Sequence, residues 1–147
     1  MALKTFDLTK VAVTIDDLPI TGFQDGDAIE FSFNDDLYEK KVGADGSVTR
    51  AAKNDRTAQV TLNLLYTSEA NTVLNDLLKA DRSDGSGAKS LLVEDTSGAF
   101  RFFAPEAWVM KHPDFSMGQE TPALEWVLDT SQAEVDFLGI PSPNLAG

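Results

Sequence analysis

The sequence lacks cysteine and has a single histidine, His112, among its 147 residues. The absence of cysteine excludes disulfides and thiolate-bound metal ions, and one histidine cannot form a histidine cluster for zinc. A Ser-His-Asp triad would have only one possible base. Basic residues are also scarce: twelve stand against twenty-four acidic residues, for a net charge of −12. This balance argues against a general nucleic-acid binder and against binding to anionic membranes, because both need a basic surface.

Long hydrophobic runs are missing as well. The longest apolar stretches span only a few residues, whereas a membrane-spanning helix needs about 20. The first six residues contain no apolar segment of the kind that a secretory signal requires. Hydrophobic residues nevertheless make up 42% of the chain, which is enough to build a core. We therefore expect a soluble chain, made in a cytoplasm, that folds as one domain over residues 1–147.

Apolar and polar residues alternate along four segments of the chain, residues 10–15, 28–34, 57–64 and 124–128. Alternation of this kind is typical of half-buried strands in antiparallel sheets. Residues 90–94 form a further expected strand. The polar positions of the second and third segments are Glu30, Ser32, Asn34, Gln59, Thr61 and Asn63.

Residues 68–82 depart from this period. Their apolar residues recur at helical spacing and form one stripe, made of Ala70, Val73, Leu74, Leu77 and Leu78. Thr67 or Ser68 can cap the start of this helix, with Glu69 in its first turn. The run of serine and glycine at residues 83–87 ends it. The sequence therefore predicts a mainly β fold, a β-sandwich or partial barrel flanked by one α-helix at about residues 68–82.

Residues 40–56 are polar and charged, and they are centred on an Asp45-Gly46 turn signal. This segment holds five of the twelve basic residues of the chain: Lys40, Lys41, Arg50, Lys53 and Arg56. We expect a hairpin or long loop that stands off the body. A second Asp-Gly turn signal lies at residues 24–27. Residues 139–143 contain two prolines and cannot join a central strand.

Two patterns suggest chemistry but lack its requirements. Residues 85–90 resemble a phosphate-binding loop, yet Ala88 precedes Lys89, and the loop leads from a helix into a strand, the reverse of the required order. Acidic pairs occur at turns, whereas a glycosidase needs two carboxylates that face each other across a cleft. Solvated turn acids are the better interpretation of these pairs, which are Asp16 with Asp17, Asp25 with Asp27, and Asp35 with Asp36.

The two tryptophans, Trp108 and Trp126, leave two interpretations open. They are suited to a carbohydrate-stacking platform, but both lie in largely apolar, strand-like stretches, which favours packing in a core or interface. His112 precedes a proline and is typical of a loop residue. We predict no catalytic residue, no metal ligand and no cofactor.

Three stretches of the chain form an ordered set: residues 42–50 with Asn54-Asp55; residues 67–71 with Leu74 and Ala80-Asp81; and residues 106–114 with residues 118–120 and Glu125-Trp126. In this order and spacing they resemble the tail tube proteins of contractile-tailed bacteriophages. The resemblance extends from about Val11 to Gly139, with one departure at Met117-Gly118, where we expect an aromatic residue before the glycine.

The resemblance implies a structural subunit without enzymatic activity. Six copies would form a ring whose inner strands join into one continuous β-barrel, and the rings would stack into a tube. The tube would surround the tape-measure protein during assembly and conduct DNA in transit, without binding it specifically. Its other partners would be the tail sheath, baseplate and tail terminator proteins, and the subunit would bind no membrane. The protein would reside in the virion tail after assembly in the host bacterial cytoplasm.

Within this picture, two sets of residues acquire roles. The polar strand positions Glu30, Ser32, Asn34, Gln59, Thr61 and Asn63 would face the lumen, in at least one of the two strands. The charged residues Lys40, Lys41, Asp45, Arg50, Lys53 and Arg56 would contact a neighbouring subunit, in the next ring. Such contacts between like-charged subunits would depend on salt.

Three alternatives remain at this point. A tube subunit of a type VI secretion system or of a phage-tail-like bacteriocin shares the same architecture. A monomeric β-sandwich that binds a ligand through Trp108 or Trp126 belongs to a different class, as does an acidic glycosidase.

Overall fold

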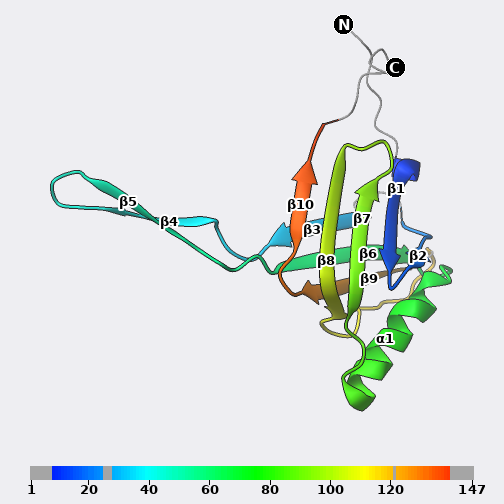
Figure 1. Cartoon of the computed structure of the whole chain (residues 1–147). Helices are drawn as coiled ribbons and strands as arrows, with labels where there is room; N and C mark the ends of the chain where they lie inside the picture. Colours follow the sequence, from blue (N-terminus) through cyan, green and yellow to red (C-terminus); the bar gives the residue numbers. More distant parts are fainter. Residues whose placement is uncertain (1–7, 25–27, 121, 140–147) are drawn as a thin grey trace, which may run out of the picture.

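The computed structural model describes residues 8–24, 28–120 and 122–139 (Figure 1). The strands are antiparallel, and one α-helix separates the sixth strand from the seventh. The elements in chain order are the 3-10 helix η1 (Leu8–Lys10), β1 (Val11–Ile15), β2 (Leu18–Ile20), β3 (Ile29–Phe33), β4 (Tyr38–Val42), β5 (Val48–Ala52), β6 (Ala58–Leu65), α1 (Ala70–Asp84), β7 (Lys89–Asp95), β8 (Phe100–Val109), β9 (Ala123–Thr130) and β10 (Glu134–Phe137). The expected mainly β fold with one helix is confirmed.

One sheet folds over itself into two layers. Its strand order is β2-β1-β7-β8-β9-β6-β3, and β10 pairs with the other side of β8. Figure 1 shows β10, β8, β7 and β1 crossing in front of β3, β6 and β9. The link between the layers is β8, which pairs with β7 along its first part and with β9 only at residues 107–109. The register shift in β7 between Lys89 and Leu91 lies where the two layers separate.

The core lies between these layers and follows the alternation in the sequence. In β6 every second side chain is fully buried, while the intervening ones are half-buried. In β9, Trp126 and Leu128 are buried on the same side, opposite Leu62 and Val60 of β6. The strands predicted from alternation are therefore correct. The fully buried β6 residues are Ala58, Val60, Leu62 and Leu64.

Helix α1 packs its apolar stripe against the end of the sandwich, with Leu74 fully buried and Leu77 half-buried. Its bounds differ from the expected ones by two residues at each end. Glu69 precedes the helix instead of lying in its first turn, because the side-chain amide of Asn71 holds the preceding turn by donating to the carbonyls of Leu65 (2.9 Å) and Ser68 (3.0 Å). The N-cap position is Glu69, so the prediction of Thr67 or Ser68 as the cap is wrong, although the Ser68 hydroxyl accepts the Ala70 N–H.

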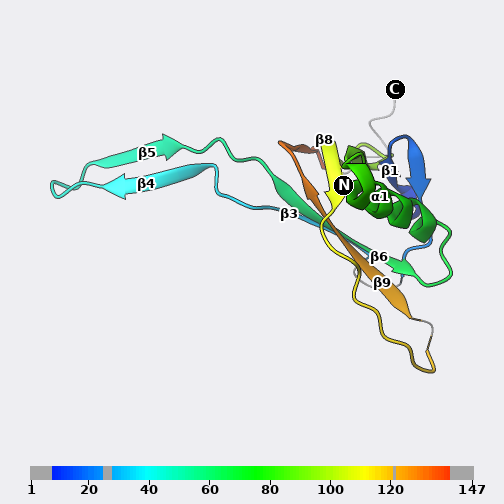
Figure 2. The same ribbon diagram turned by 90° about the horizontal axis from the view of Figure 1, so that it is seen from below.

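The segment between β3 and β6 is a long hairpin. β4 and β5 pair with each other alone and project away from the body, which Figures 1 and 2 show from two directions. Every residue of the two strands is exposed. We call residues 38–52 the arm. The expected turn is present at its tip: Gly46 has a φ of 87°, and the Asp45 carboxylate accepts the Ser47 N–H at 3.0 Å. Hydrogen bonds from Ser47 lower the pKa of Asp45 below its ordinary value.

The turn acids predicted from the sequence lie partly within and partly outside the described residues. Asp16 and Asp17 occupy the tight turn between β1 and β2 with φ values of 52° and 64°, which confirms that they are turn acids. The turn signal that contains Asp25 and Asp27 lies outside the described residues, as does most of residues 139–143. Within the described parts of the chain, no helix is long and apolar enough to cross a membrane.

We predict that Leu74→Ala lowers the free energy of unfolding by about 2–5 kcal/mol, because a fully buried leucine leaves a cavity. Leu77→Ala, at a half-buried position of the same helix, should cost clearly less. Chemical denaturation of the subunit measures both values. Equal losses in the two variants would contradict the assignment of the packed face.

Candidate assembly surfaces

The outward face of the layer β3-β6-β9 is polar. The register places Glu30 opposite Thr61 and Ser32 opposite Gln59, so the polar positions of both strands share one face. Those of β3 are exposed and those of β6 are half-buried. Asn34 follows β3, and its side-chain amide donates to the Thr57 hydroxyl at 3.0 Å. The structure therefore brings together on one face the two sets that the sequence suggested separately.

This face continues onto β9 and the end of β8. Asn63 lies opposite Glu125, and Gln59 lies opposite Asp129, which in turn pairs with Trp108 of β8. The strand positions on this face carry three carboxylates and no cation. We call it the polar face: Glu30, Ser32, Gln59, Thr61, Asn63, Trp108, Glu125 and Asp129, with the buried Val127 between the last two.

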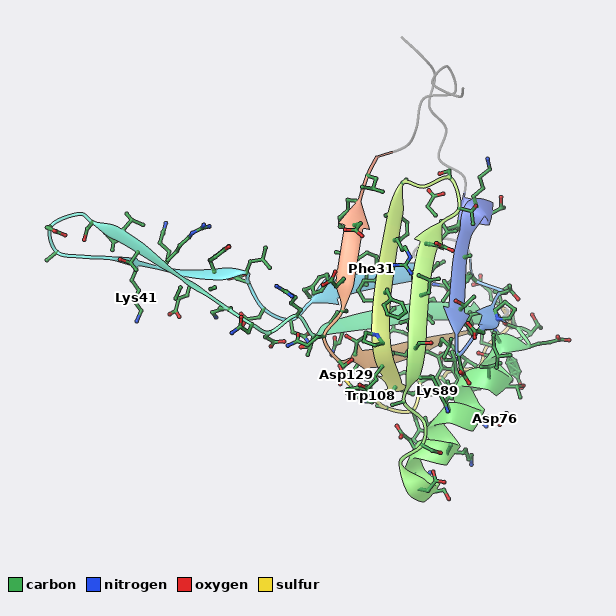
Figure 3. The ribbon with its side chains drawn as sticks, viewed as in Figure 1. Phe31, Lys41, Asp76, Lys89, Trp108 and Asp129 are labelled. Carbon is green, nitrogen blue, oxygen red and sulfur yellow. The ribbon has the colours of Figure 1, made fainter. Side chains whose placement is uncertain are left out.

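Sequence reasoning missed Asp129 and Trp108 as members of the polar face. The alternation in residues 124–128 indicated the side that Glu125 takes, and its extension by one residue would have found Asp129. No local pattern in the sequence places Trp108 on this face, because it lies beside Asp129 only through the pairing of β8 with β9. Figure 3 shows Trp108 and Asp129 close together at that crossing.

The two tryptophans have different environments. Trp126 is 3% exposed, and its indole N–H donates to the Asn71 side-chain oxygen at 2.9 Å. A side chain so enclosed cannot stack on a sugar, so Trp126 is a core residue. Trp108 is half-buried on the polar face, where its ring is only partly accessible.

The loop after α1 has no free anion cradle of the phosphate-binding kind. Gly85 ends the helix with a φ of 75°, and the Gly87 N–H is donated to the Asp81 carboxylate at 3.0 Å. A Cβ on Gly87 would lie 2.3 Å from the Leu77 carbonyl oxygen, so packing against the helix explains this glycine. These contacts favour a role for residues 85–88 as a connector between α1 and β7.

The six charged residues expected to contact a neighbour fall into three groups. Lys40 and Arg50 lie opposite each other on one side of the arm, and Lys41 is on the other side. Asp45 belongs to the tip. Lys53 and Arg56 lie at the arm root, by which we mean residues 35–37 and 53–56. Figure 3 shows Lys41 far out on the arm.

At the arm root, Lys53 binds its own chain. Its ammonium group lies 3.1 Å from the Asp35 carboxylate. Its backbone N–H donates to the Leu37 carbonyl at 2.9 Å. The hydrogen bond and the charge of Asp35 raise the pKa of Lys53 above its ordinary value. Both groups are about one-third exposed, so this pair guides the direction of the arm more than it stabilises the fold.

Gln132, in the turn between β9 and β10, binds the part of the arm root that follows β5. Its side-chain oxygen accepts the Arg56 N–H at 2.5 Å, and its amide donates to the Asn54 carbonyl at 2.7 Å. One side chain thus binds the backbone on both sides of Asp55. The Asp55 carboxylate accepts the hydroxyl and N–H of Thr57, which lower its pKa. These contacts fix where the arm leaves the body.

Solved structures of contractile injection systems share this fold. The anti-feeding prophage cap, which terminates the tube, superposes with a TM-score of 0.65 at 12% identity, covering 94% of this chain and 95% of that one. The sheath/tube terminator of the extracellular contractile injection system PVC gives 0.64 at 14% identity, over 90% and 96%. The PVC sheath-tube complex gives 0.64 at 12% identity, over 91% and 93%. The chain therefore shares its fold with these proteins of contractile injection systems.

The family follows from the sequence comparison. Residues 5–139 match the model of the bacteriophage PhiTE tail tube protein, and the chain belongs to this family. It is also 30% identical, over 111 residues, to the structural protein ORF10 of Pseudomonas phage KPP10; the match covers 74% of this chain but 64% of that protein. The resemblance to phage tail tube proteins is therefore confirmed, and the family is one of phage structural proteins.

We predict that Gln132→Ala loosens the arm root without unfolding the subunit, because both lost hydrogen bonds are at exposed positions. Amide hydrogen exchange at residues 53–57 should become faster, while the unfolding free energy changes by no more than about 1–2 kcal/mol. Gln119→Ala, at an exposed loop glutamine, is the matched control. Unchanged exchange at the arm root would show that Gln132 does not hold it.

Proposed function

We propose that the chain is the tube subunit of a contractile phage tail. Six copies form a ring, the polar face lines the bore, and rings stack into the tube. The tube surrounds the tape-measure protein during assembly, conducts DNA during infection, and lies inside the sheath between the baseplate and the tail terminator. The observation that carries this proposal is the polar face, which adjoins a complete hydrophobic core on its other side and belongs to a chain of the tail tube family.

The charge of the polar face suits passage of DNA. Its three carboxylates, repeated in every copy, would give the bore a negative potential that repels phosphates. Its hydroxyl and amide side chains keep it wetted. DNA would then slide without a specific binding site, since specific or non-specific binding needs cations against the backbone. No enzymatic chemistry is required for this role.

The strand edges of this layer support ring formation. β3 is at the end of the sheet order, and its outer edge has no partner strand in the described chain. At the opposite side of the layer, Trp108 and Val109 of β8 pair with β9 and with no other described strand. Exposed edges favour pairing with another chain. A neighbouring copy joined at each side would remove both edges and close a continuous barrel.

A tube terminator is the second candidate, because two of the similar solved structures are those of a tube-terminating cap and of a sheath/tube terminator. The two roles differ in self-assembly: a tube subunit stacks indefinitely, whereas a terminator stops after one ring. Electron microscopy of the purified chain distinguishes them. Long tubes with a central bore support the tube subunit, single rings support the terminator, and monomers at all concentrations contradict both.

The absence of native cysteine permits a direct test of the bore. We predict that Ser32→Cys, on the polar face, is protected from a bulky polymer-maleimide in assembled tubes, because the reagent cannot diffuse along the lumen. Thr72→Cys, on the exposed side of α1, is the control and should stay reactive. In dissociated subunits both cysteines should react equally. Equal labelling of both in intact tubes would contradict a luminal polar face.

A further inference from the structure

The arm has two chemically different sides. β4 and β5 pair in register, so alternate residues of both strands share a side. We call one side the valine face and the other the threonine face. The valine face consists of Tyr38, Lys40, Val42, Val48, Arg50 and Ala52. The threonine face consists of Glu39, Lys41, Thr49 and Ala51.

The valine face combines exposed apolar groups with cations. Val42 and Val48 lie opposite each other near the tip and are 62% and 64% exposed. Lys40 and Arg50 form the next pair toward the body, and no carboxylate lies on this face. The Arg50 guanidinium lies 4.0 Å from the centroid of the Tyr38 ring, which orders both side chains on the same surface. An ordered apolar and basic surface is suited to contact with an apolar and acidic one.

The threonine face has no such character. Glu39 and Lys41 lie two residues apart on the same strand, β4, so this face carries one acid and one base and has no net charge. Its other members, Thr49 and Ala51, are small. The arm therefore offers one side for a contact and one side for water, although its basic residues are distributed over both.

We infer that the valine face is the contact surface of the arm and that it docks on a second copy of this chain. This inference rests on the proposed function and adds the side on which the contact is made. Charge complementarity identifies the occupant: the chain as a whole has a net charge of −12, so another copy presents the acidic surface that Lys40 and Arg50 require. Nothing in the subunit's own described body covers the arm, since all ten strand residues are exposed.

A polyanion such as DNA fits the valine face less well. Binding to a phosphate backbone draws its strength from many cations, and this face has two, flanked by apolar groups. Val42 and Val48 would be buried against a protein surface but not against phosphates.

The arm of one copy would contact a different surface on the next copy. Such a contact is heterologous, and it repeats from subunit to subunit.

Adjacent charge reversals test the inference. Lys40→Glu places an acid on the valine face, and Lys41→Glu makes the same change in net charge on the threonine face. We expect Lys40→Glu to raise the critical concentration for assembly, measured by sedimentation, about tenfold, and Lys41→Glu to change it by less than about twofold. Circular dichroism should show both variants folded.

A second pair of variants separates apolar contact from charge. Val48→Thr keeps the shape and the strand preference of the side chain but lowers its hydrophobicity, and it should weaken assembly at low and high salt alike. Thr49→Ser on the threonine face is the control and should assemble as the wild type does. The effect of Lys40→Glu should shrink as salt rises.

The outcomes distinguish this inference from the proposed function. Equal effects of the two lysine variants, or a larger effect of Lys41→Glu, overturn the assignment of the valine face while tubes still form. A wild-type chain that stays monomeric overturns both. If Lys40→Glu leaves the critical concentration unchanged but reduces retention of the subunit on a DNA duplex, the occupant is a nucleic acid and the inference is wrong.

Discussion

This structure depends on one β-layer that must present a hydrophobic side to the core and a polar side away from it. Strands β3, β6 and β9 place every second side chain in the hydrophobic core, and the strand period of two sends the others outward. A slip of one residue would exchange the two sets, so the buried row that contains Val60 and Leu62 fixes the position of the polar row that contains Thr61. The stability of the subunit and the polar character of the proposed bore therefore depend on the same register.

The arm, unlike this layer, has no side that packs on the core. It buries nothing within the subunit, and an isolated two-stranded ribbon is marginal in water. Its direction is instead set at the root, where Gln132 and the ion pair between Lys53 and Asp35 bind the two strands of the connection. A fixed departure point limits the directions that the exposed ribbon can take, so contact with a neighbour requires less ordering than a free loop would. The proposed role of the arm follows from this combination.

Much of this fold could be predicted because local pattern and tertiary packing agree. Alternation located β1, β3, β6 and β9, and the stripe containing Leu74 located the helix. The passage of β8 between layers could not be predicted, since it depends on pairings between distant segments, and Trp108 was left ambiguous for that reason. The sides of the arm follow from the register of β4 with β5, which the sequence alone did not fix. Glu69 was misplaced because Asn71, a side chain inside the helix, holds the turn before it.

The central claim is that the polar face of β3, β6 and β9 lines the bore of a tube. A cryo-electron microscopy map of the assembled chain, at a resolution that traces strands, tests it most directly. The account predicts a continuous inner barrel in which Ser32 and Thr61 point into the lumen and α1 lies outside it. A map in which these residues pack against a neighbouring hydrophobic surface, or in which α1 lines the bore, would contradict the account.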